Sequence, residues 1–166
     1  MSSPTHIYDE LARTVDRLNR IVEATQALNS TLDLSELTQI ILQIVRDEVG
    51  IERGTVFVMT PDRRHLRSLV AQEVDAEIEL NIGAGIACSV AKDGDVIDIP
   101  DAYKDARFDR SFDAQLGFKT RDIYCMPIRN RTDSIVGVLQ LLNRSRPLTK
   151  GDEDFLAGIS VHIGLA

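Results

Sequence analysis

The residues with the clearest chemical use lie in the stretch GAGIACSV, from Gly83 to Val90. It predicts a glycine turn that opens a short helix, which should stop at Gly94. The first backbone N–H groups of a helix have no intrahelical partner and lie at its positive end, so they can hold an anion. The third glycine of a dinucleotide fingerprint and the GK[ST] of a P-loop are absent. Taken alone, the motif is a weak indication of a phosphate site.

Residues that could act as catalysts are poorly arranged for it. The sequence places His6 on a helix, His65 at a strand start and His162 on a terminal helix, with no Ser or Cys nucleophile beside any of them. The two cysteines, Cys88 and Cys125, have no metal-binding spacing, and Cys125 falls inside an apolar strand where we expect it to be buried. We therefore expect no enzymatic activity, no metal and no resident cofactor.

Composition limits the remaining classes of function. With 166 residues and 43% hydrophobic content, the chain can form one globular domain without a metal or disulfide. A net charge of -7 argues against a nucleic-acid partner, which needs clustered Lys and Arg, although a local site can still bind a small anion. The N-terminus lacks the order of a signal peptide, and no apolar run approaches the roughly 18 residues of a membrane helix. We expect a cytoplasmic protein with no membrane partner.

Two apolar runs near the C-terminus predict the centre of the fold. They are Ile123–Ile128 and Ile135–Leu142, and between them Asn130–Asp133 has turn chemistry, so together they predict an antiparallel hairpin. Everything earlier in the chain should pack on this hairpin or cover it.

The N-terminal segment predicts one long helix. Its seam alternates steps of four and three, the spacing that keeps one helix face on a line. The seam residues are Ile7, Leu11, Thr14, Leu18, Ile21, Thr25 and Leu28. This helix could pack on its own domain or form a dimer coiled coil. We assign residues 1–31 to it, as a linker or dimerisation element.

A second helix should begin after Asp33, whose side chain can cap it while Glu36 answers in a capping box. Its apolar face comprises Leu34, Leu37, Ile40, Ile41, Ile44 and Val45. Short strands are predicted at 55–59, 66–70, 78–82 and 96–99, followed by a loop at 102–116. Helices followed by antiparallel strands indicate an α+β domain.

The end of the chain predicts a further helix. Thr149–Asp152 resembles a second capping box, and apolar residues recur at helical spacing after it. The periodic pattern has no Gly or Pro termination before Ala166. We expect the natural protein to continue beyond this point.

The order of these motifs resembles a known family. GAGIACSVAKDG, DVIDIPDAY, LGFKTRDIYCMPI, IVGVLQLLNR and LTKGDEDF together look like a GAF domain of the cyclic-nucleotide-binding type, found in mammalian cyclic-nucleotide phosphodiesterases and bacterial adenylyl cyclases. The resemblance covers residues 32–166, which we assign as the GAF domain. It implies a six-stranded antiparallel sheet with the N- and C-terminal helices packed on one face and a ligand pocket on the other.

The resemblance also implies a pocket-bracing motif. The family has Asn-Lys, then Phe, three residues and Asp-Glu. Here Asn143 and Arg144 match the first part, with Arg for Lys, and Asp152 and Glu153 match the second, with Leu148 for Phe. In the family the cation and the Asp pair with each other, so an Arg144–Asp152 pair is implied, and Arg can form it bidentately.

Six ligand-binding positions are implied in the same way. They are Thr55 for the base, Ile86 and Ala87 for the phosphate, Asp113 and Thr120 in the lid, and Gln140 at the base edge. Gln140 offers both a donor and an acceptor, so it does not decide between adenine and guanine. Two positions depart from a relative: Asp109 replaces an aromatic residue and Leu116 replaces Thr.

Two functions are compatible with these residues and with the resemblance. The first is a regulatory sensor that binds a small ligand, cAMP or cGMP, under a lid at Gly117–Thr120 and signals to an absent output domain through its terminal helices. The alternative is a GAF module that binds no nucleotide and serves dimerisation or takes another small molecule. Both hypotheses include a homodimer formed through the terminal helices.

Overall fold

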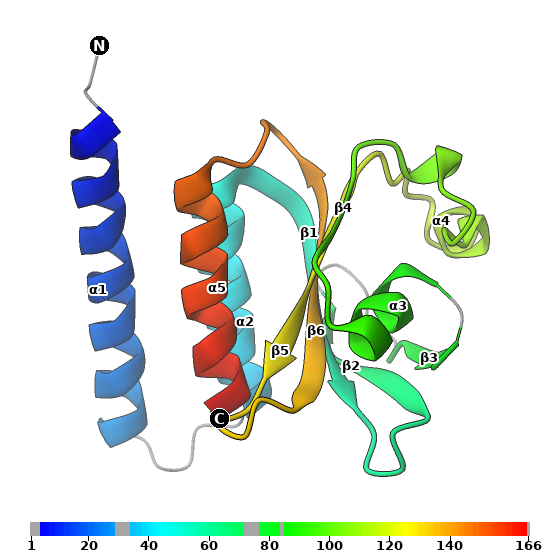
Figure 1. The fold of residues 1–166 in the computed structure, drawn as a ribbon, viewed down its shortest axis with the longest axis horizontal. Coiled ribbons are helices and arrows are strands. Elements are labelled where there is room, and N and C mark those ends of the chain that lie inside the picture. The colour runs from blue at the N-terminus through cyan, green and yellow to red at the C-terminus, as the bar shows by residue number, and fades with distance from the viewer. Residues whose placement is uncertain (1–3, 29–33, 72–76, 84, 166) are drawn as a thin grey trace.

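The computed structural model describes residues 4–28, 34–71, 77–83 and 85–165. Helices and strands alternate irregularly along the chain (Figure 1). The helices are α1 (Pro4–Leu28), α2 (Leu34–Val45), α3 (Ile86–Asp93), α4 (Arg110–Leu116) and α5 (Lys150–Leu165), with short helical turns η1 (Arg46–Gly50) and η2 (Ala102–Lys104). The strands are β1 (Ile51–Met59), β2 (His65–Ala71), β3 (Glu79–Asn81), β4 (Ile97–Ile99), β5 (Ile123–Arg129) and β6 (Ile135–Arg144).

The six strands form one antiparallel sheet, as the family resemblance implied, and their order is β3-β2-β1-β6-β5-β4. The predicted hairpin is confirmed as β5 and β6, which pair from Ile123 opposite Leu142 to Arg129 opposite Ile135. Asn130 closes its turn, because its side-chain oxygen accepts hydrogen bonds from the backbone N–H groups of Thr132 and Ser134. The sheet's central strands are therefore β1 and β6, which come from opposite ends of the sequence.

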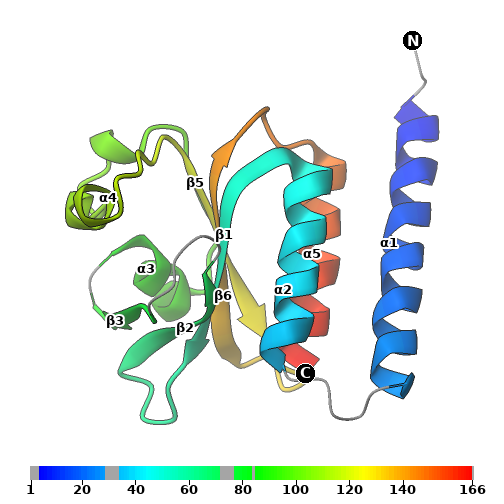
Figure 2. The ribbon, with the colours of Figure 1, turned by 180° about the vertical axis from the view of Figure 1, so that it is seen from behind.

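Helices α2 and α5 cover one face of the sheet, α1 lies outside them, and α3 and α4 lie on the other side (Figures 1 and 2). Leu37, Ile41 and Val45 of α2 follow one another at a spacing of four and are buried against the sheet. The predicted face was wrong in one place: Ile40 is 46% exposed, and Leu42 is fully buried instead. Leu42 lies on the inner side because it is one turn after Thr38, which is also buried.

Helix α1 packs on α5 within the same domain. Leu18 is buried, and Leu11 and Val15 pack partly buried against the same core. Gly151 of α5 allows this approach, since a Cβ placed there would lie 2.5 Å from the Leu11 side chain. Ile7 at the start of the predicted seam is exposed. The seam side chains at 21, 25 and 28, and the predicted cap at 33, lie outside the described residues.

The second capping box is confirmed at the start of α5. The Thr149 hydroxyl accepts from the Asp152 N–H at 3.1 Å, and the Asp152 carboxylate accepts from the Thr149 N–H at 2.8 Å. These bonds satisfy two groups that a helix start leaves without intrahelical partners. Within the described part of the chain, no helix is long and apolar enough to cross a membrane.

Candidate functional site

A cavity of about 620 Å³ lies on the face of the sheet opposite α1, α2 and α5. Its size falls within the range of small-molecule sites. The sheet contributes Arg53, Thr55, Phe57, Ile123, Gln140 and Leu142; the segment around β3 and the start of α3 contributes Ile78–Asn81 and Gly85–Ala87; and the segment above contributes Ala106–Asp109, Phe112, Asp113, Leu116, Phe118 and Thr120. All six sequence-predicted ligand positions line this cavity, so the fold brings together residues from 55 to 140.

The floor of the cavity carries the polar pair Thr55 and Gln140. These residues are opposite each other on β1 and β6, so their side chains point to the same face. Apolar floor residues, including Phe57 and Ile123, surround them. A floor of this kind can bury an apolar ring while offering it a few hydrogen bonds.

One wall is the start of α3. Gly85 caps the helix with φ 91° and ψ 170°, and it has no side chain to accept from the first N–H groups. The first intrahelical bond runs from Ser89 N–H to Gly85 O at 3.1 Å. The N–H groups of Ile86 and Ala87 therefore belong to the helix start that has no intrahelical acceptor, beside the cavity.

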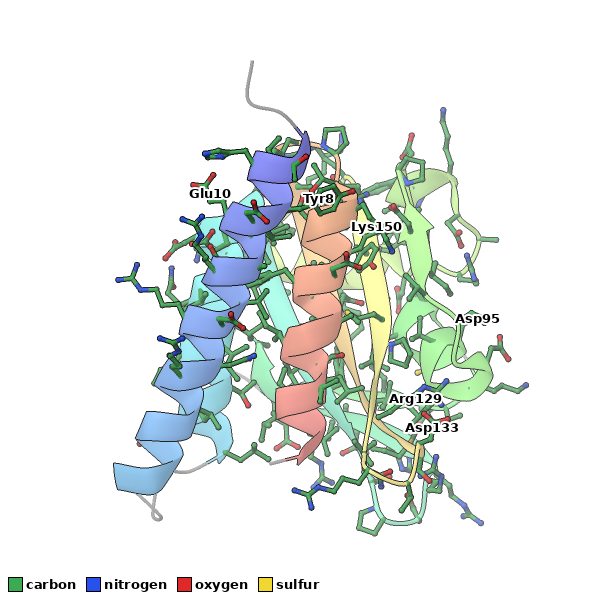
Figure 3. The ribbon with its side chains drawn as sticks, turned by 60° about the vertical axis from the view of Figure 1, so that its left-hand side comes forward. Tyr8, Glu10, Asp95, Arg129, Asp133 and Lys150 are labelled. Carbon is green, nitrogen blue, oxygen red and sulfur yellow. The ribbon has the colours of Figure 1, made fainter. Side chains whose placement is uncertain are left out.

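The other end of α3 is fixed to the β5–β6 hairpin. Gly94 ends the helix in the left-handed conformation, and its carbonyl accepts from Arg129 Nη2 at 3.4 Å. The same guanidinium donates to the Asp133 carbonyl at 3.0 Å, and Figure 3 shows Arg129 and Asp133 together at the end of the hairpin. This anchoring holds the helix axis, and with it the N–H groups at its start, in place.

A buried carboxylate ties together the segment from Tyr103 to Thr120, which includes the predicted lid at Gly117–Thr120 and is called the lid from here on. Asp113, 8% exposed, accepts the Tyr103 hydroxyl at 2.7 Å, and it accepts both the backbone N–H and the hydroxyl of Thr120, at 2.7 and 2.8 Å. The bond to Asp113 is the main cause that raises the pKa of Tyr103. Both carboxylate oxygens of Asp113 are thus used within the lid. We assign Asp113 and Thr120 a positioning role in this state.

Aromatic side chains form the roof. Phe118 lies under the Arg53 guanidinium, 3.8 Å from the ring centroid, and Phe108 packs on Tyr103 with centroids 5.3 Å apart. Phe112 also lines the cavity. Arg53 was not predicted from the sequence as a site residue, and Phe118 was predicted only as part of the lid at Gly117–Thr120. Arg53 lies two positions before Thr55, so the sequence indicates that the two side chains share one face of a strand. The contact of Arg53 with Phe118 depends on the position of the lid.

Asp109, which replaces an aromatic residue of a relative, caps α4. Its carboxylate accepts the Ser111 N–H at 2.9 Å and the Ser111 hydroxyl at 2.6 Å, and these bonds lower the pKa of Asp109. Arg107 pairs instead with Asp105, at 2.8 Å. Leu116 is exposed and lies at the cavity edge. The extra carboxylate of Asp109 is therefore occupied by hydrogen bonds within the lid.

Asn143 joins the lid to the sheet. It is buried, with φ 58°, and its side-chain oxygen accepts the Arg121 N–H at 2.6 Å. Its amide nitrogen donates to the Lys119 carbonyl at 2.9 Å and to Glu52 at 3.0 Å. The bond from Asn143 is the main cause that lowers the pKa of Glu52. The end of the lid is thereby fixed to β1 and β6.

The implied Arg144–Asp152 pair was wrong. Arg144 donates to Asp122 from Nε and to Asp98 from Nη2, both at 2.7 Å. Asp152 instead accepts from Arg146, at 2.5 and 3.1 Å. Burial alone would raise the pKa of Asp152, but the bonds from Arg146 and Thr149 outweigh it and hold the pKa below its ordinary value.

Asp152 pairs with Arg146 and not with Arg144 because of the direction in which strand β6 ends. Arg144 is still part of β6, and its backbone N–H also bonds to Asp122, so its side chain is directed toward β5 and β4. Arg146 follows after the strand, beside the start of α5, and also donates to the Glu48 carbonyl. Glu153 is exposed on the first turn of α5 and is not among the residues that line the cavity. In the sequence Asn-Arg-Ser-Arg, the two arginines lie at similar distances along the chain from Asp152, so spacing alone does not choose between them.

Neither cysteine forms a disulfide, and both are buried, as expected for Cys125. Burial raises the pKa of each thiol. His65 lies at 4.0 Å from both Asp62 and Glu79, and His6 is exposed on α1. Among the described residues, no group of three or more His, Cys, Asp or Glu could hold a metal ion.

Fold and site together define an α+β domain with a cavity of small-molecule size on one face of the sheet. A family model for the GAF domain matches residues 33–166, and the chain belongs to this family. We therefore describe it as a regulatory domain of the GAF type.

Individual relatives agree with this assignment. The chain is 31% identical over 160 residues to the dual 3',5'-cyclic-AMP and -GMP phosphodiesterase 11A of Takifugu rubripes, covering 87% of this chain and 18% of that protein. The chain thus spans about a fifth of the length of this relative.

Two solved structures share the fold. The GAF domain of a phosphoenolpyruvate-protein phosphotransferase from Coxiella burnetii has a TM-score of 0.75 at 15% identity, covering 98% of this chain and 93% of that one. The free methionine-R-sulfoxide reductase of Neisseria meningitidis has a TM-score of 0.71 at 12% identity, covering 99% and 90%. At these identities the likeness concerns the fold alone.

Proposed function

We propose that this GAF domain binds a cyclic purine nucleotide in the lidded cavity and passes the binding event to an output domain through its terminal helices. The observation that carries the proposal is the cavity's composition. It joins the uncapped start of α3, suited to a phosphate, with a polar and apolar floor at Thr55, Phe57 and Gln140, suited to a purine. The phosphodiesterase relative is a dual cyclic-AMP and cyclic-GMP enzyme, which supports the same ligand class.

The lid supplies a physical means of signalling. Lys119 and Arg121 are hydrogen-bonded to Asn143, and β6 then leads through Arg146 to Asp152 at the start of α5. A ligand that binds better when the lid is closed shifts the population toward that state. The proposal is that closing the lid changes how α5 is held. The output domain and the sign of regulation lie outside this chain.

Isothermal titration with cyclic AMP and cyclic GMP tests the binding. We expect one site per chain, and weaker binding of adenosine and guanosine because they lack the phosphate that the α3 start would hold. Thr55→Val removes a floor hydroxyl and should weaken binding roughly three- to tenfold, the value of one hydrogen bond. The matched control is Thr38→Val, since Thr38 is equally buried but lies on the other face of the sheet, and its affinity should be unchanged.

Folded protein that gives no heat with either cyclic nucleotide would end this proposal. Asp113 and Thr120 are unsuitable as test positions, because their loss would open the lid whether or not they touch ligand.

A second candidate function is dimerisation through the helical layer. Ile7 and Tyr8 on α1 and Val161 on α5 are each more than half exposed, and Figure 3 shows Tyr8 at the same end of this layer as Lys150. Light scattering of the protein and of an Ile7→Ser, Tyr8→Ser variant tests it. These positions are preferable to removal of α1, which would also uncover the α5 residues under Leu11 and Leu18. A monomer in both samples would exclude this function for α1.

A further inference from the structure

A row of three side chains crosses the middle of the sheet on the cavity side. Cys125 on β5 is opposite Gln140 on β6, and Gln140 is opposite Thr55 on β1. Gln140 and Thr55 line the cavity, whereas Cys125 is fully buried beside them. Cys125 does not line the cavity, and the side-chain hydrogen bond described for it goes to Gln140.

The hydrogen bond between Cys125 and Gln140 has a defined donor and acceptor. The Cys125 thiol donates to Gln140 Oε1, with Sγ and Oε1 3.5 Å apart. Burial, the largest cause, raises the pKa of this thiol, so it keeps its proton and stays a donor. A glutamine amide carries its acceptor on one branch and its two donors on the other. When Oε1 faces β5, the Nε2 group is directed away from Cys125.

A glutamine amide can distinguish the two purines at position 6 of the ring. Guanine carries a carbonyl oxygen there, an acceptor, whereas adenine carries an amino group, a donor. An amide that pairs with adenine uses its oxygen to accept from this amino group and its nitrogen to donate to N7. If the thiol keeps the oxygen turned toward β5 and away from the ligand, the adenine pairing loses one of its two bonds, while O6 and N7 of guanine can both accept from Nε2.

We propose that Cys125 is a positioning residue that fixes the Gln140 amide with its donors toward the ligand, so that the domain prefers a cyclic nucleotide with guanine over one with adenine. This inference rests on the proposed function and adds the choice of base. The sequence left this choice open, since Gln140 alone can serve either purine.

The test measures a ratio of affinities. Titration of the intact domain with cyclic AMP and cyclic GMP should give cyclic GMP the lower Kd by roughly three- to tenfold, the range of one net hydrogen bond. Cys125→Val removes the thiol donor and should bring the ratio close to one. Cys125→Ser keeps a donor at the same position and should retain the preference, which a purely packing role for Cys125 would not predict.

Two further variants make the result specific. Cys88→Val is the matched control, because Cys88 is also a buried thiol on the cavity side but donates to the Asn81 carbonyl, at 3.2 Å. Its ratio should stay that of the unchanged protein. Gln140→Leu removes the amide itself and should abolish the preference even if Cys125→Val does not fold.

The outcomes separate this inference from the proposed function. Binding of both nucleotides with no preference for cyclic GMP, or a preference that survives in Cys125→Val, overturns the role of Cys125 and leaves the cyclic-nucleotide site standing. Absence of binding to either nucleotide by folded protein overturns both.

Discussion

The partner of Asp152 can be identified by a double-mutant cycle, because two arginines compete for it in sequence and only Arg146 contacts it in the structure. Asp152 is 5% exposed and accepts two bonds from Arg146 in addition to the Thr149 N–H. Bonds to a charged group contribute about 1.5–3 kcal/mol, and the half-exposed Arg146 side chain reduces this, so we expect Arg146→Met to cost about 1–2 kcal/mol.

Asp152→Asn is the second change of the cycle, since Asn keeps an oxygen for the Thr149 N–H while it removes the charge. Urea unfolding of the single and double variants should give a coupling of about 1–2 kcal/mol between Arg146 and Asp152. The control cycle pairs Asp152→Asn with Arg144→Met. Its coupling should lie within about 0.5 kcal/mol of zero, as for sites without contact.

A cycle in which Arg144, and not Arg146, couples to Asp152 would refute the described geometry and restore the pair that the family resemblance implied. Arg144→Met alone should still destabilise the protein, because Asp98 and Asp122 lose their partner. The single variants are therefore uninformative, and only the coupling decides.

Other expected outcomes concern stability. Thr38→Val should raise the free energy of unfolding in urea by about 1 kcal/mol, because no described residue bonds the buried Thr38 hydroxyl; a loss of stability would contradict this. Gly158→Ala should stabilise α5 by about 0.5–1 kcal/mol, since the new Cβ meets Val15 at an ordinary 3.8 Å, whereas Gly164→Ala should destabilise by about 1–3 kcal/mol, since its Cβ would meet the Arg129 carbonyl; equal effects in thermal unfolding would argue against that close contact. The lowered pKa of Asp152 means that its stabilisation is complete above the unfolded value of about 3.9 and is lost as the pH falls through the folded value. Acid unfolding of Asp152→Asn should accordingly be less steep than that of the unchanged protein below about pH 4, and parallel curves would exclude this contribution.

Much of the fold followed from local chemistry in the sequence. The β5–β6 hairpin was predicted because Asn130 and its neighbours form a turn whose bonds span four residues. The capping box of α5 was predicted because Thr149 and Asp152 are three residues apart, the spacing at which the two side chains reach each other's backbone. Even the end of α3 followed from Gly94, which can adopt the left-handed conformation.

The candidate site was predictable only in part. Family resemblance indicated six positions, and the fold brings all of them to one cavity. The partners of the polar residues around this cavity depend on how the lid folds. Asp113 is used by Tyr103 and Thr120 within the lid, and Asp109 is used to cap α4. The roof contact of Arg53 with Phe118 joins residues on different elements, so no local pattern could announce it.

The sequence by itself determined most of the elements, their order and, by resemblance, the family, because caps, turns and hydrophobic spacing act over a few residues. It did not determine α4, which lies within the segment 102–116 that was predicted as a loop. Beyond these local caps and turns, the tertiary structure decided which partner a polar group takes. Asp152 lies within reach of two arginines along the chain, and the direction in which β6 ends selects Arg146. Gln140 carries a donor and an acceptor at every stage of folding, and the strand beside it brings the Cys125 thiol to its oxygen. A hydrogen bond depends on ångström-scale placement of both groups, and for residues far apart in sequence that placement exists only once the sheet has formed.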